Sequence, residues 1–152
     1  MKIEFHLAWL KAGGSIPKAF KSAAARELFL EYVTRVSKFV PCEAAGIGAD
    51  GHERKSGTNV WVCQRGAGAK IFSSEEVAAG LRQLADSGIR ALDIWIGGAN
   101  GFNERELGKL QPDLLWSFGP LTLPHELAAV IASEQIYRAW TIVRNQPYHL
   151  AH

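Results

Sequence analysis

The residues best equipped for chemistry lie in the last third of the chain. Glu134 and Arg138 stand four positions apart in a stretch with helical spacing, which His125 begins and which Tyr148 and His149 follow. Together these side chains make a plausible polar set, in which a histidine can exchange protons near neutral pH. The plainer interpretation is an ordinary ion pair and a loose tail. Spacing alone leaves both interpretations open.

Two segments have the composition of ligand-binding loops. Residues 97–101 (Gly-Gly-Ala-Asn-Gly) follow an apolar stretch, and their glycines allow backbone amides to approach a ligand. This segment matches neither GxGxxG nor a P-loop, and a tight turn is the simpler explanation. Residues 119–125 place apolar side chains between two prolines. A buried loop of this kind needs partners for its backbone groups, which an adenine edge or the surrounding protein would supply.

Signals for several other chemistries are missing from the sequence. There is no GxSxG motif, and neither Cys42 nor Cys63 lies in a reactive motif, which argues against hydrolases and covalent catalysis. The five histidines have no metal-binding spacing, so we expect no metal site. We expect both cysteines to be buried thiols rather than a disulfide.

Alternating strand and helix signals predict the frame that positions these segments. We expect an α/β domain with a mostly parallel sheet and helices on both faces. The predicted strands are 3–9, 42–47, 60–63, 92–96 and 114–118, and the predicted helices are 23–39, 73–86, a short one capped at Asn103, and 124–145. Residues 48–58 and 65–70 are predicted loops. The buried helix faces are predicted to be Leu28, Phe29, Tyr32, Val33 and Val36 in the first helix and Leu127, Val130, Ile131, Trp140 and Val143 in the last.

Three predicted loops lie at the same edge of this sheet. Residues 64–70, 97–101 and 119–124 each follow a predicted strand. Because ligands of parallel α/β sheets bind beyond the carboxyl ends of the strands, we expect a ligand site where these loops meet.

Length and composition limit the possible classes of protein. The 152 residues fit a single domain, residues 1–152, with a formal net charge of +2. Without a leader peptide signal or an apolar run of about 20 residues, we expect a cytoplasmic protein with no membrane contact. The first third carries the basic residues Lys11, Lys18, Lys21, Arg35, Lys38, Arg54 and Lys55. A solvated surface is the simpler interpretation of this cluster, and an RNA-binding patch is the alternative.

The last third also resembles a known family. Ile96-Gly97-Gly98 with Gly101, the run Leu121–His125, the run Glu134–Trp140 and the ending Pro147–His149 occur in the order and spacing of the ribosomal large-subunit RNA methyltransferase H family. The resemblance implies a SPOUT-superfamily domain whose C-terminal segment is threaded through a deep trefoil knot, a rare exception to unthreaded topology. It further implies a homodimer with a site built across the interface. Such a dimer transfers a methyl group from S-adenosylmethionine to N3 of a pseudouridine in large-subunit ribosomal RNA of the assembled ribosome.

The resemblance also assigns roles to residues of this chain. The positions that hold S-adenosylmethionine are matched by Val62, Gly98, Gly119, Pro120, Leu121, Thr122, Leu123 and Pro124. The positions that handle the substrate are matched by His125, Arg138, Tyr148 and His149. We therefore expect His149 to accept or relay the N3 proton and Arg138 to stabilise charge on the flanking carbonyls. Tyr148 is expected to stack on the extruded base.

The chain departs from the family at several positions. The polar loop 48–58 stands where family members usually carry a helix, Cys63 replaces an acidic residue, and Ala129 replaces an arginine. The lysine-bearing turn after the first strand is altered to His6–Lys11. Two alternatives therefore stand beside the main hypothesis: a methyltransferase that acts on a different RNA, and a non-catalytic knotted module that binds RNA or the ribosome.

Overall fold

The computed structural model describes residues 1–48 and 51–150, with every side chain in these ranges except that of His149. Six strands form one sheet in the order β2-β1-β5-β3-β6-β4, and each pairing of neighbouring strands is parallel. The strands are β1 (Lys2–Leu7), β2 (Cys42–Ala45), β3 (Thr58–Cys63), β4 (Lys70–Ile71), β5 (Ala91–Ile96) and β6 (Leu114–Ser117). The α/β class and the mostly parallel sheet are confirmed.

The helices begin where the sequence signals place them. They are α1 (Ala23–Val36), α2 (Ser74–Asp86), α3 (Glu104–Leu110) and α4 (His125–Val143), with short 3-10 turns η1 (Ile16–Ala19) and η2 (Pro147–Leu150). Ser73 with Glu76 and Asn103 with Glu106 form complete capping boxes at the starts of α2 and α3. Each box supplies partners for backbone groups that the first helical turn leaves open.

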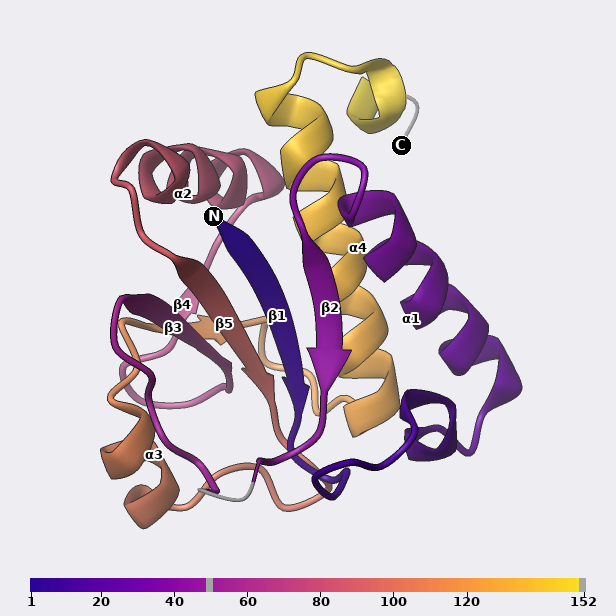
Figure 1. Cartoon of the computed structure of the whole chain (residues 1–152), viewed down its shortest axis with the longest axis vertical. Helices are drawn as coiled ribbons and strands as arrows, with labels where there is room; N and C mark the ends of the chain where they lie inside the picture. The colour runs from indigo at the N-terminus through magenta and orange to yellow at the C-terminus, as the bar shows by residue number, and fades with distance from the viewer. Residues whose placement is uncertain (49–50, 151–152) are drawn as a thin grey trace.

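The larger part of the core lies on one face of the sheet. There α1 and α2 both pack against α4, and the three helices cover the alternating side chains Ile3, Phe5 and Leu7 of β1. Figure 1 shows α4 crossing behind the sheet, from the edge where the strands end to the edge where the chain begins. None of the helices in the described residues is long and apolar enough to cross a bilayer.

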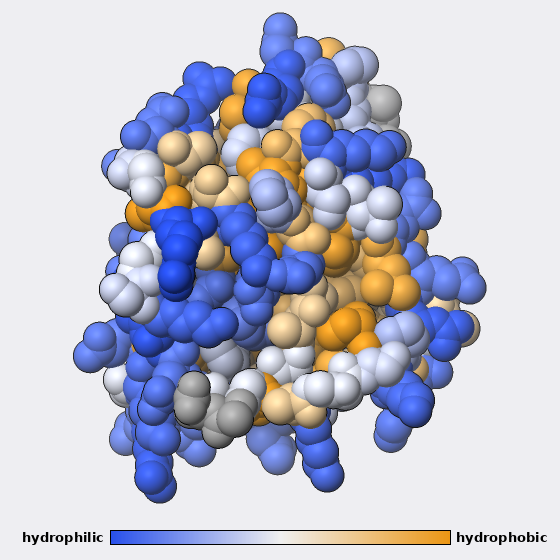
Figure 2. All heavy atoms as spheres, viewed as in Figure 1, coloured by the Kyte–Doolittle hydropathy of each residue, from blue (hydrophilic) through white to orange (hydrophobic). Residues whose placement is uncertain are grey.

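The opposite face of the sheet is covered only in part. Leu110 of α3 packs there in a smaller cluster with Val60, Val62 and Trp95. The described residues between β2 and β3, 46–48 and 51–57, form no helix, as their composition predicts. Figure 2 shows hydrophilic residues gathered over the middle of this face. Among the described residues, Figure 1 shows no helix over β1 and β2 on this face.

Several predictions about individual elements are wrong. The first helix ends at Val36 rather than at residue 39, because the Ser37 hydroxyl donates to the Val33 and Cys42 carbonyls and turns the chain into β2. The predicted loop 65–70 ends inside β4, which no signal predicts: its two residues are exposed and carry no apolar pattern, and the strand exists only by pairing with β6. Leu28 and Leu127 were expected to be buried but are 46% and 44% exposed, since they lie at the flanks of the buried stripes.

Candidate active site

A cavity of about 350 Å³ lies at the carboxyl ends of β3, β5 and β6, where the sequence predicts a ligand site. Its volume is in the range of small-molecule sites. Its walls come from the ends of these strands, the loops that follow them and the first turns of α4. The lining residues are Cys63, Gln64, Arg65, Ile96, Gly97, Gly98, Ala99, Asn100, Gly101, Phe102, Trp116, Phe118, Gly119, Leu121, Thr122, Leu123, His125 and Ala128.

The glycine loop after β5 is a tight turn that also forms one wall of this cavity. The Gly101 amide donates to the Gly98 carbonyl at 3.0 Å, and Gly101 has a φ of 65°, which favours glycine. A Cβ on Gly97 would lie 3.0 Å from the Gly101 Cα and 3.1 Å from the Phe102 ring. The interpretations of this loop as a tight turn and as a ligand-binding loop are therefore compatible, because the compact turn places its backbone at the cavity.

The apolar loop after β6 forms the opposite wall, and it is more exposed than the sequence suggested. Leu121 is 71% exposed, and the carbonyl of Pro120 accepts a hydrogen bond from the Arg65 guanidinium at 2.9 Å. Gly119 adopts a φ of 103°, and its amide donates to the Ser117 hydroxyl at 3.1 Å. The expectation of a buried loop is wrong for the single chain, because its leucine faces outward beside the cavity.

Gln64 contributes a polar atom that sequence reasoning missed. Its Oε1 is buried and, within residues 1–48 and 51–150, has no hydrogen-bond partner. A buried amide oxygen without a donor is costly, so a ligand N–H or O–H at this wall would be favourable. The neighbouring Cys63 is a neutral thiol, since burial raises its pKa. This side of the cavity therefore offers an uncharged acceptor, the Gln64 Oε1, beside a neutral thiol.

His125 lies at the other side of the cavity, at the first residue of α4. Its ring meets that of Trp9 edge to face, with centroids 4.5 Å apart, and the Trp9 indole N–H donates to the Ala19 carbonyl at 2.7 Å. The Ser22 amide donates to the Glu126 carboxylate at 3.0 Å. The segment between Trp9 and Ser22 is thus fastened to the start of α4, next to the cavity.

A second polar group forms at the far end of α4. The Arg138 guanidinium donates to the Glu134 carboxylate at 2.5 Å, and the Tyr148 hydroxyl donates to the same oxygen at 3.2 Å. The Arg138 guanidinium carbon lies 5.1 Å from the centre of the Tyr148 ring, which also contacts Tyr137. The predicted ion pair is confirmed. The interpretation of Tyr148 as part of a loose tail is wrong, because these contacts hold it against the helix.

The two polar groups do not converge within one chain. His125 and Arg138 are separated by 13 residues of a continuous helix, which corresponds to about 20 Å along its axis. The arrangement in a single chain therefore gives a cavity at one end of α4 and an arginine–tyrosine group at the other.

Residues 16–149 match the family described as predicted SPOUT methyltransferase. The chain belongs to this family. It is 35% identical to ribosomal RNA large subunit methyltransferase H of Sorangium cellulosum over 131 residues, which cover 78% of this chain and 84% of that protein. It is 36% identical to the protein of the same name from Koribacter versatilis over 140 residues, covering 87% and 92% of the two chains. A shorter match of 80 residues to the Saccharophagus degradans protein of that name is 46% identical, covering 53% of this chain and 50% of that one.

In this SPOUT methyltransferase the expected cofactor residues fall into two sets. Those that line the cavity are Gly98, Gly119, Leu121, Thr122 and Leu123. Pro120 and Pro124 belong to the same loop but do not line it, and Val62 is fully buried in the small core cluster with Trp95. Val62 therefore packs in the core next to Cys63, which lines the cavity, and does not itself face the cavity.

The expected substrate residues of this SPOUT methyltransferase are also divided. His125 lines the cavity, whereas Arg138 and Tyr148 lie together at the other end of α4. The side chain of His149 lies outside the described part of the structure. Gln64 and Trp9 belong to no recognisable motif. The only sequence signal for them is their position, because each lies just after a strand, Gln64 after β3 and Trp9 after β1.

Proposed function

We propose that this SPOUT methyltransferase binds S-adenosylmethionine in the cavity and methylates N3 of a pseudouridine in large-subunit ribosomal RNA, in the cytoplasm. One observation carries the proposal: the two loops that resemble the family's cofactor loops, 97–101 and 119–125, face each other across one cavity. The names of the relatives support ribosomal RNA as the class of substrate.

The residues around the cavity suit this cofactor. The unpartnered Gln64 Oε1 offers an acceptor for an amino or hydroxyl group, and the Trp116 and Phe118 rings supply apolar area for a purine. The loop around Gly119 brings further backbone groups to the same space. When bound, S-adenosylmethionine supplies an already electrophilic methyl group, so the protein's task is mainly to align donor and acceptor.

The nucleotide must lose the N3 proton before or during methylation. Burial, together with hydrogen bonds to Tyr32 and Glu134, raises the pKa of Tyr148, so its hydroxyl remains protonated at neutral pH. Tyr148 therefore serves as a donor and a ring surface rather than as a base. We assign proton acceptance to His149 and stabilisation of the anionic base to Arg138. Glu134 orients the Arg138 guanidinium by accepting its hydrogen bond.

A second copy of the chain completes the site in this proposal. Because His125 and Arg138 lie about 20 Å apart along α4, a complete site needs the Arg138 end of one chain beside the cavity of another. Leu121 at 71% and Leu127 at 44% exposure offer apolar contacts beside the cavity for such a partner. The proposal also includes the trefoil knot of the C-terminal segment that the resemblance implies.

The basic residues near the cavity fit an RNA substrate. Lys11, Lys18 and Lys21 are exposed on the segment that Trp9 and Ser22 fasten to α4. Arg54, in contrast, is occupied within the fold, where it bonds the carbonyls of Gln111 and Thr58. We assign RNA contact to the three lysines and a structural role to Arg54.

The test is methyl transfer from labelled S-adenosylmethionine to large ribosomal subunits and assembled ribosomes that lack the modification, followed by nucleoside mass spectrometry. We expect label in N3-methylpseudouridine. Label in a different nucleoside or RNA would favour the alternative substrate, and ribosome binding without cofactor binding would favour the non-catalytic module.

Mixed dimers test the shared site. An Arg138→Ala chain and a Gly119→Ala chain, each weak alone, are expected to regain activity when mixed, because one of the two sites then receives both intact halves. Activity that never exceeds the sum of the separate variants would contradict a site shared between chains. A monomer mass in sedimentation at micromolar concentration would contradict it independently.

A further inference from the structure

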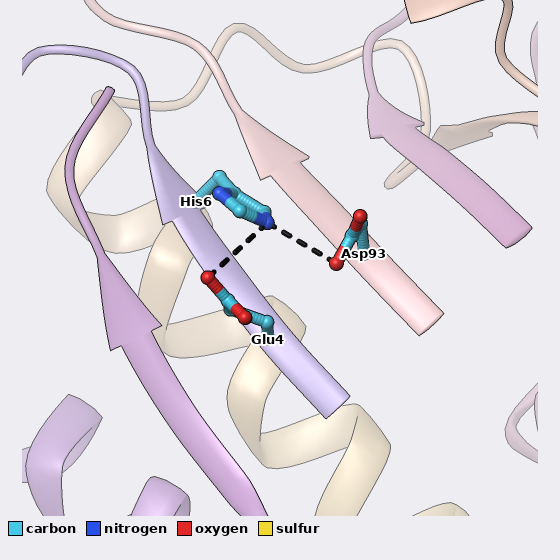
Figure 3. Close-up of side chains that lie close together, drawn as sticks. All are labelled: Glu4, His6 and Asp93. Carbon is cyan, nitrogen blue, oxygen red and sulfur yellow. Dashed lines mark ion pairs between the residues drawn. The ribbon is translucent and has the colours of Figure 1, made fainter. Parts of the chain in front are cut away.

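The polar face of the sheet holds a group of ionisable side chains away from the cavity. Glu4 and His6 alternate on β1, and Glu4 pairs in register with Asp93 of β5. Because every second residue of a strand points to the same side, the three side chains share one face. Figure 3 shows them directed toward one another from the two neighbouring strands. None of them lines the cavity at the carboxyl edge.

The geometry of this group is that of a ligand set. The His6 Nε2 lies 3.2 Å from the Asp93 Oδ1 and 3.7 Å from the Glu4 Oε1, and one ligand atom from each residue lies within 4.8 Å of the others. Metal–ligand bonds of about 2.0–2.2 Å in a tetrahedron require ligand atoms about 3.3–3.6 Å apart. The two distances from His6 span this range, so an ion can be accommodated with small side-chain adjustments.

The imidazole supplies an independent sign of a missing ligand. His6 is only 5% exposed, and its Nε2, although directed at two carboxylates, has no hydrogen-bond partner among the described residues. The His6 ring stacks on Trp95, with centroids 4.3 Å apart and planes 8° apart, which fixes the direction in which Nε2 points. A buried nitrogen held in place toward two oxygens is suited to donate its lone pair to a cation.

The surrounding charges leave room for a cation. Lys2 contacts the Oε2 of Glu4 at 3.3 Å and also pairs with Glu43, so it uses the oxygen of Glu4 that does not face His6. Asp93 is 4% exposed, and a buried carboxylate requires a positive or hydrogen-bonding partner. The side chain of Glu4 retains 14% exposure, which gives the group an edge toward solvent.

We propose that Glu4, His6 and Asp93 bind a divalent transition-metal ion, with Zn²⁺ as the preferred ion. One imidazole and two carboxylates suit first-row metals, and three nitrogen and oxygen ligands in a tetrahedron with one open position are an arrangement typical of Zn²⁺. Three ligands are too few for Ca²⁺, which takes six to eight oxygens. The ion would tie β1 to β5 and keep one coordination position at the Glu4 edge. The sequence gives no metal-binding spacing for this group, because Asp93 joins Glu4 and His6 only through strand pairing.

The test is a calorimetric titration of the full chain with Zn²⁺ after treatment with EDTA and removal of the chelator. We expect one ion per chain and a rise in the melting temperature on adding Zn²⁺. His6→Ala and Asp93→Asn should each weaken binding at least tenfold. Glu43→Gln is the matched control, since this carboxylate lies on the same face and contacts Lys2 but no ligand atom, and it should bind within about twofold of the parent chain.

Other binding sites would reveal themselves in the same experiments. Binding that survives His6→Ala but is lost in His52→Ala would overturn the proposal, because His52 pairs with Glu106 nearby. Absence of saturable binding to the parent chain would mean that the group is only an ion pair. Should the variants fail to fold, Co²⁺ is titrated into the parent chain and into His52→Ala: saturable d–d absorption without thiolate charge transfer is expected in both. Thiolate bands, loss of the signal in His52→Ala, or no saturable absorption in the parent chain would overturn the ligand set.

Discussion

Replacing Gly119 by alanine isolates the contribution of the apolar loop to cofactor binding. Gly119 adopts a φ of 103°, and a Cβ built there meets no atom within 4 Å. The substitution therefore adds backbone strain without a clash, and such strain costs an L-residue about 1–2 kcal/mol. The free loop can relax to relieve this strain, whereas binding requires the original conformation. The strain then appears as weaker binding of S-adenosylmethionine by about 5–30-fold.

A second glycine provides the control for this prediction. Gly66 has a φ of 114° and equally open surroundings, but it does not line the cavity. Gly66→Ala should lower the melting temperature at least as much as Gly119→Ala and leave cofactor affinity within about twofold of the parent chain. Equilibrium dialysis with labelled cofactor and thermal unfolding measure the two quantities. Equal affinities of the Gly119→Ala, Gly66→Ala and parent chains would refute the assignment of this loop to the cofactor.

Three other outcomes follow from the structure. Arg138→Ala should lower turnover by about 10²–10³ while leaving cofactor affinity unchanged, since Arg138 is assigned to the nucleotide base and not to the cofactor. An undiminished rate of methyl transfer in single-turnover assays would contradict its role. Replacing Lys11, Lys18 and Lys21 by glutamine should make ribosome binding less dependent on salt. The slope of log affinity against log salt concentration should decrease by roughly 0.7–0.9 for each lost phosphate contact. An unchanged slope would mean that these lysines do not contact RNA. Burial raises the pKa of Cys42 from 9.0 to about 12, so above pH 9 the unfolded state releases a proton that the folded state keeps. The free energy of unfolding should therefore fall by about 1.4 kcal/mol per pH unit from this thiol. Denaturant unfolding at several pH values above 9 should show that the free energy of unfolding falls less steeply with pH in Cys42→Ala than in the parent chain.

Much of the frame could be predicted because its signals are local. The capping boxes at Ser73 and Asn103 mark helix starts within a few residues, and the apolar run in β5 marks a central strand. The meeting of the three loops at one edge follows from parallel topology alone. β4 could not be predicted, since two exposed residues form a strand only when β6 is already beside them.

The candidate site was less accessible to sequence reasoning. The resemblance to the family identified Gly98 and Leu121–Leu123, but the unpartnered oxygen of Gln64 depends on packing that no local pattern encodes. The group of Arg138 and Tyr148 was recognised by resemblance, and its distance from His125 follows from the predicted helix 124–145, but the contacts that hold Tyr148 against Glu134 and Arg138 depend on how the chain turns back after α4. The pairing of Glu4 with Asp93 likewise depends on the strand order, which joins residues far apart in the chain.

The central claim is that the cavity at the carboxyl edge of the sheet binds a methyl donor. The most direct measurement is a calorimetric titration of the parent chain with S-adenosylmethionine and, separately, with its demethylated product. We expect saturable binding of both ligands, with one molecule per chain or one per dimer. Absence of binding for both ligands would contradict the claim, and the loops around Gly98 and Gly119 would then keep the shape of a cofactor site without its function.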